Sequence, residues 1–150
     1  MSLFATTCLF LTNGYSYDWD SEDDMFFDDT VYASIYITTD FDNTTETASC
    51  YFSFYVSNDG PGEVKMYTTA TMELFWNGGS VSPDPREDTA IVEANSTGSI
   101  YEDFSFNLRN KPEGPGSMWA EGKLDVRHIP TNVKSSVDPP AFSETFFEIL

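Results

Sequence analysis

Alternation of apolar and polar residues is the feature that most restricts the fold of this chain. In segment 47–57, Cys50, Phe52, Phe54 and Val56 share one side, and serines and tyrosines occupy the positions between them. A period of two is the spacing of a β-strand with one buried face. No window places apolar residues at helical spacing over three turns. The pattern therefore predicts an all-β protein.

The same pattern recurs along the whole chain, between short segments rich in Gly, Pro and Asn that are typical of turns. It predicts strands at 3–12, 31–38, 47–57, 64–76, 89–94, 100–108, 118–126 and 143–150. About eight short strands with frequent turns favour one domain, residues 1–150, folded as an antiparallel β-sandwich of Ig-like or jelly-roll type. A closed barrel is the second possibility.

Residues 47–127 resemble an immunoglobulin-like sandwich module of archaeal and bacterial surface-adhesion proteins, a type that also recurs on the capsids and tails of tailed viruses. The segment FYVSNDGPG (54–62) is similar to the V-x-N-x-G element of those modules, and GSMWAEGKLDVRH (116–128) resembles their closing strand. The resemblance covers about half of the chain. It implies a sandwich fold and a role in adhesion or assembly, and it implies no catalytic site.

The charge of the chain excludes several classes of partner. The net charge is −18, and the first 64 residues contain twelve acids and no lysine or arginine. Nucleic acids and anionic membrane surfaces are bound through basic residues, so neither is expected as a partner. No apolar run is long enough for insertion into a membrane. A folded domain this acidic is typical of a high-salt environment, where ions screen its self-repulsion; an acidic protein of an ordinary medium is the alternative.

The most acidic segment is DWDSEDDMFFDD, residues 18–29. Its alternating acids match the first ligand positions of an EF-hand, but Asp23 stands where that loop requires Gly, and Asp29 where it requires Glu. The segment is therefore interpreted as an acidic loop of another kind. We favour a solvated loop over an irregular Ca²⁺ or Na⁺ site, whose ligands would be Asp18, Asp20, Glu22 and Asp24.

The sequence offers little for catalysis, and we expect neither an enzyme nor a cofactor. His128 is the only histidine, and no G-x-S-x-G motif accompanies it. Zinc requires three or four nitrogen or sulfur ligands, which the chain does not supply at close spacing. The two cysteines, Cys8 and Cys50, lie on apolar-facing strand positions, which favours two buried thiols over a disulfide.

The C-terminal segment 141–150 is predicted to form an interface. It follows an Asp-Pro-Pro sequence, which ends the preceding segment. It is rich in apolar residues, namely Phe142, Phe146, Phe147, Ile149 and Leu150. Exposed apolar patches of this kind mark interfaces. We expect the segment to bind a neighbouring chain, as an added strand or through its aromatic rings. On this interpretation the domain folds without it.

These features predict a non-enzymatic structural subunit of a virion, namely a capsid or tail accessory (decoration) protein of a tailed virus infecting a halophile. Its partners would be other virion proteins and copies of itself. The alternative is a secreted or cell-surface module that recognises glycans through exposed tyrosines and tryptophans, since aromatic rings serve both kinds of binding.

Overall fold

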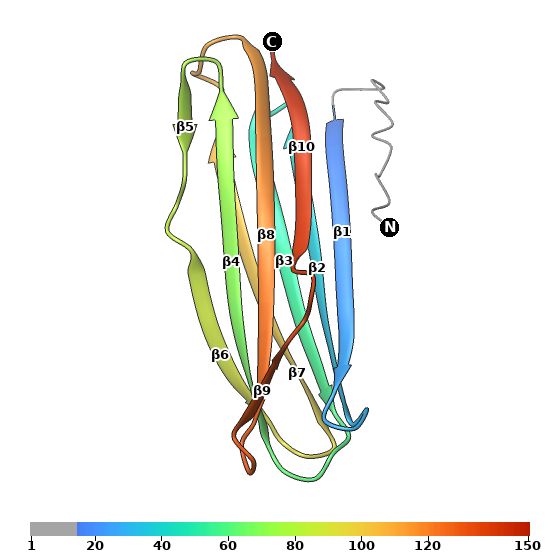
Figure 1. Cartoon of the computed structure of the whole chain (residues 1–150). Coiled ribbons are helices and arrows are strands. Elements are labelled where there is room, and N and C mark those ends of the chain that lie inside the picture. Colours follow the sequence, from blue (N-terminus) through green and yellow to red (C-terminus); the bar gives the residue numbers. More distant parts are fainter. Residues whose placement is uncertain (1–14) are drawn as a thin grey trace.

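The chain folds into two antiparallel sheets packed face to face (Figure 1). The computed structural model describes residues 15–150. Sheet A has the order β1 (Tyr15–Phe26), β2 (Val31–Asp42), β3 (Thr47–Asn58) and β7 (Ser96–Asn107). Sheet B has the order β10 (Ala141–Ile149), β8 (Gly114–His128), β4 (Val64–Trp76) and β5 (Gly79–Val81). In addition, β6 (Arg86–Val92) pairs with β4, and β9 (Val133–Ser136) pairs with β8.

The predicted antiparallel β-sandwich is confirmed. The part of the chain that the structure describes contains ten strands rather than about eight, because β1 was not predicted and β5 and β9 are short additions to sheet B. The strand predicted at 3–12 lies outside the described residues. Residues 15–150 contain no helix that is long and apolar enough to span a membrane.

The core lies between the sheets and follows the alternation seen in the sequence. Along β2 and β3, every second residue is buried, with Phe41, Phe52 and Phe54 fully covered. The even-numbered residues of β4 and β8 face them from sheet B. Gly122 of β8 allows the two sheets to approach closely, because a Cβ there would lie 3.0 Å from Ile35 Cγ2. Burial of these apolar side chains is the main stabilising contribution to the fold.

The predicted turn at 58–62 is held by a buried asparagine. Asn58 is 1% exposed, and its Nδ2 donates to the carbonyl oxygens of Gly62, Val92 and Glu93 at 2.9, 3.2 and 3.1 Å. Its Oδ1 accepts from the Gly60 amide at 3.1 Å. Both N–H groups of the amide, one of them shared between two carbonyls, and its oxygen are thus used. This fixes the corner through which β3 of sheet A leads into β4 of sheet B.

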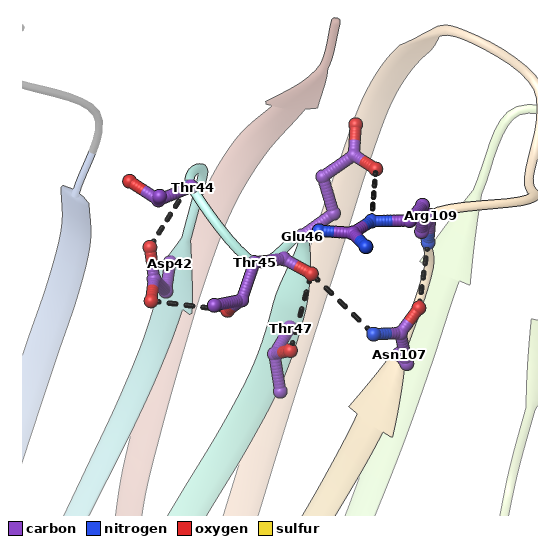
Figure 2. Close-up of polar contacts among 7 residues, drawn as sticks. All are labelled: Asp42, Thr44, Thr45, Glu46, Thr47, Asn107 and Arg109. Atoms are coloured by element: carbon purple, nitrogen blue, oxygen red, sulfur yellow. Dashed lines mark hydrogen bonds and ion pairs between the residues drawn. The ribbon is translucent and has the colours of Figure 1, made fainter.

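The turn between β2 and β3 is fixed by polar contacts at the opposite end of the sandwich (Figure 2). The Asp42 carboxylate accepts from the Thr44 amide at 2.8 Å and from Thr45 Oγ1 at 3.0 Å. These hydrogen bonds lower the pKa of Asp42. Asn107, the last residue of β7, donates to the Thr45 carbonyl at 3.4 Å. The turn is therefore attached to two strands as well as to itself.

Candidate functional site

The acidic segment is a strand, and its prediction as a loop is wrong. Residues 15–26 form β1, which pairs with β2 along its whole length, and the chain turns only at residues 27–30. The alternation of β1 is reversed relative to the other strands. Tyr17, Trp19 and Met25 point outward and are exposed. The half-buried carboxylates of Asp18, Asp20, Glu22 and Asp24 lie on the side that faces the other sheet.

Two of these carboxylates bind the backbone of the C-terminal strand. Asp20 Oδ2 accepts from the Phe142 amide at 2.8 Å, and Asp18 Oδ2 accepts from the Glu144 amide at 3.0 Å. Charge-assisted bonds of this kind are stronger than neutral ones. β1 of sheet A is thereby joined to β10 of sheet B, and Asp18 and Asp20 are structural elements rather than parts of a solvated run.

A buried group of hydroxyls continues this connection into the core. Ser143 Oγ donates to Asp18 Oδ2 at 3.0 Å and is 2.8 Å from Thr39 Oγ1. Thr39 Oγ1 is also 2.8 Å from Thr145 Oγ1, which donates to the Thr39 carbonyl at 3.0 Å. Buried hydroxyls are costly unless they are paired, so these contacts fix the position of β10 against β2.

The four acids lie in a row along β1 and not around a common centre. Residues two apart on a strand lie roughly 7 Å from each other, so their oxygens spread along β1 instead of converging. Among residues 15–150, no group of three or more His, Cys, Asp or Glu side chains is placed to hold a metal ion. A strand thus separates the ligands that a loop would have brought together.

Neutralising two neighbouring acids of β1 should have opposite effects on stability. Asp20→Asn weakens the bond to the β10 amide and should lower the free energy of unfolding by about 1 kcal/mol. Glu22→Gln should raise it by a few tenths of a kcal/mol. The reason is that burial, and then the charges of Asp20 and Asp23, raise the pKa of Glu22, so the folded state disfavours its charged form.

Urea unfolding at pH 7 measures both changes. The gain in the free energy of unfolding from Glu22→Gln should vanish when the pH falls below 4.5, the ordinary pKa of glutamic acid. Below that pH the side chain is neutral in both the folded and the unfolded chain. If both substitutions shift the midpoint in the same direction, net charge rather than position governs the role of these acids.

The C-terminal segment is divided between core and surface. It forms β10, which pairs with β8, and its odd-numbered residues face inward. Phe147 stacks on Phe41 with ring centroids 4.2 Å apart, and Ile149 is 2% exposed. The expectation that Phe147 and Ile149 bind a neighbour is therefore wrong, because both belong to the protein's own core. Phe142, Phe146 and Leu150 are exposed, and their role as interface residues stays a prediction.

The exposed phenylalanines are part of an apolar patch on the outer face of sheet B. Phe146 and Phe75 are 55% and 41% exposed and lie on either side of Ser117, at the rim of a shallow hollow of about 280 Å³. Phe142 stacks on Trp119 with centroids 5.9 Å apart. We call Phe75, Trp119, Phe142 and Phe146 the phenylalanine patch. Phe75 was not predicted, and Trp119 was expected only as an exposed aromatic residue, because their proximity to β10 depends on strand order.

The outer face of sheet A is rich in tyrosines and hydroxyls. Tyr51 and Tyr101 stack with centroids 6.1 Å apart, and the Tyr17 and Tyr36 hydroxyls are 3.1 Å apart. Serines and threonines fill the positions between the rings. We call this surface the tyrosine face. It agrees with the predicted outward direction of Tyr17, Trp19, Tyr36, Tyr51 and Tyr101.

A hollow of about 330 Å³ lies on the tyrosine face near the β2–β3 turn. Its polar groups are two carboxylates and several hydroxyls. Ser49 Oγ donates to the Asp40 carboxylate within it. The residues that define the hollow are Thr38, Asp40, Ser49, Tyr51, Asp103 and Ser105.

His128 and Cys50 are both held within the fold. His128 Nδ1 is 2.7 Å from Thr131 Oγ1, and its Nε2 is 3.1 Å from the Pro61 carbonyl. Cys50 is a buried free thiol, and burial raises its pKa to about 12. Such a thiol is a poor nucleophile. Cys8 lies outside the described residues.

Comparisons with known proteins identify no relative. No protein-family model and no curated protein sequence matches this chain. Among solved structures, it is similar to the X-ray structure of a Northeast Structural Genomics Consortium target, with 12% identity and a TM-score of 0.38 over 88% of this chain and 87% of that one. A similarity this low carries no argument about function.

Proposed function

We propose that this protein is a non-enzymatic structural subunit of a larger assembly and acts through protein–protein contacts. The observation that carries the proposal is the phenylalanine patch, where Phe75, Phe142 and Phe146 are each more than 40% exposed on a regular sheet. Large apolar side chains grouped on a surface are typical of interfaces, and the centre of an interface is enriched in aromatic residues.

The setting we propose is a virion, in which the chain is a capsid or tail accessory protein of a tailed virus with a halophilic host. The resemblance to virion sandwich modules and the net charge of −18 support this setting. In this role the sandwich carries surfaces that bind other proteins, and the role itself requires no catalytic centre.

The experiment compares incorporation of variants into particles. Phe75→Ser with Phe146→Ser removes the centre of the phenylalanine patch, and Ile91→Ser removes an exposed apolar residue of β6 as a control. An antibody raised against the chain should detect many copies in particles from the cells that encode it. Loss of two central aromatic contacts should lower incorporation more than tenfold, whereas Ile91→Ser should be incorporated normally.

Absence of the protein from any particle would contradict the virion setting. Equal incorporation of the double variant and Ile91→Ser would contradict the role of the phenylalanine patch. Circular dichroism of each purified variant should match the wild type, which separates lost binding from lost folding.

The second candidate is a secreted or cell-surface module that binds glycans. The tyrosine face favours it, because its hollow combines a ring with carboxylate and hydroxyl acceptors that suit sugar hydroxyls. Titration with purified polysaccharides should then give saturable binding that Tyr51→Ala abolishes, with the protein monomeric throughout.

A further inference from the structure

Charge is divided unequally between the two sheets. The four strands of sheet A contain no lysine or arginine. The strands of sheet B contain five of the seven basic residues, namely Lys65, Arg86, Lys123, Arg127 and Lys134. Sheet A is thus acidic throughout, whereas sheet B carries bases among its acids, although the whole molecule is strongly acidic.

The tyrosine face supplies acceptors for a cation. Asp40 and Asp103 lie on the two strands that flank β3, on either side of the hollow. No ion pair among residues 15–150 uses the Asp103 carboxylate. Tyr51 and Tyr101 offer ring faces beside these groups, and such rings attract lysine and arginine. The turn of Figure 2 holds the nearby strand ends in place.

Sheet B supplies cations that already lie around a tyrosine. Lys65 Nζ, Lys134 Nζ and the Arg127 guanidinium carbon are 5.1, 5.4 and 5.8 Å from the centre of the Tyr67 ring. Lys134 also pairs with Asp125 at 2.8 Å. We call these three bases and Tyr67 the basic cluster. It lies on the outer face, at the end of the sheet away from the phenylalanine patch.

We propose that the tyrosine face of one copy binds the basic cluster of a second copy. This inference rests on the proposed function, since it names a partner within the assembly. The charges are complementary, and both surfaces contribute tyrosine rings. A face of four twelve-residue strands measures about 40 by 15–20 Å, which gives roughly 700 Å². That area is close to the roughly 800 Å² per partner of a standard stable interface.

The contact joins two different surfaces. In each pair, one copy therefore retains a free basic cluster and the other retains a free tyrosine face. Such heterologous contacts extend into rings or filaments instead of closing as a dimer. The hollow lies near the start of β3, whereas the basic cluster lies near the start of β4, at the other end of the sandwich. Stacked copies must therefore run in opposite directions or be offset along their length.

Two variants, each lacking one surface, test this directly. The first carries Tyr51→Ser and Asp103→Asn on the tyrosine face, and the second carries Lys65→Gln and Lys134→Gln in the basic cluster. Sedimentation velocity at 10–500 µM, in 0.15 M and 1 M NaCl, measures association, with Leu150→Ser, which lies outside both surfaces, as the matched control. The wild type and the control should form species larger than dimers, and each double variant alone should associate at least tenfold more weakly.

An equimolar mixture of the two variants gives the decisive result. The intact tyrosine face of the second variant should bind the intact basic cluster of the first, so that only 1:1 complexes form. Growth of the mixture beyond dimers, or full association of either variant alone, would overturn the inference. A wild type that stays monomeric at both salt concentrations would also overturn it. In that case, particle incorporation that depends on the phenylalanine patch would leave the proposed function standing.

Discussion

A chain that ends at residue 140 should fail to fold. The truncation removes β10, whose inner face contributes Phe147 and Ile149 to the core. Each of these side chains stabilises the fold by roughly 2–5 kcal/mol. The truncation also leaves the Thr39 hydroxyl without its partners Ser143 and Thr145. The combined loss is comparable with the whole stability of an ordinary domain, about 5–15 kcal/mol.

Far-UV circular dichroism and urea unfolding of the truncated chain measure this result. The matched control is Phe142→Ser with Phe146→Ser, which alters only the outer face of the same strand. It should unfold cooperatively within about 1 kcal/mol of the wild type, as surface substitutions generally do. A cooperative transition in the truncated chain would show that the sandwich closes without β10.

The second large effect is the dependence of stability on salt. The net charge of −18 is carried by a single small domain, and four half-buried carboxylates lie along one side of β1. The Debye length falls from about 30 Å at 0.01 M to about 3 Å at 1 M, so salt removes most of the repulsion between exposed charges. We expect the melting temperature to rise by on the order of 10 °C between 10 mM and 2 M NaCl, equivalent to about 3 kcal/mol for a chain of this size.

Differential scanning calorimetry over this range measures the shift, and sucrose at matched viscosity controls for solvent effects other than screening. Asp23, which points outward on β1, offers a second comparison: Asp23→Asn should reduce the salt dependence without breaking any bond to β10. A melting temperature that does not change with salt would remove the physical basis for a high-salt origin.

The sequence predicted the strands whose alternation has the usual direction, with apolar residues inward. In β3 and β4 the buried residues are those that the pattern indicated, because the hydrophobic effect selects one face of each strand. In β1 the direction is reversed, so carboxylates such as Asp18 and Asp20 face the other sheet. The energy that places them there comes from amides of β10, 122 or more residues away in the sequence. A local pattern cannot contain that information.

The C-terminal strand was predicted at 143–150, but its place in the protein's own core was not, for a related reason. Because Phe146 and Phe147 are adjacent, the apolar pattern does not indicate which face of the strand is buried. The inward positions at Ser143 and Thr145 are polar, and they are acceptable in the core only because Thr39 pairs with them. The segment therefore resembled an apolar tail. The phenylalanine patch could be predicted only in part, since Phe75 reaches Phe146 across β8.

The carboxylates that reach from β1 to β10 also protect part of the edge of sheet B. An outermost strand normally offers its amides to any extended chain nearby, which is the route to domain swapping and amyloid. Here Asp18 and Asp20 already occupy the amides of Glu144 and Phe142, and a competing strand would have to displace two charged acceptors. At these two positions the outer edge of β10 is therefore closed to the addition of another strand.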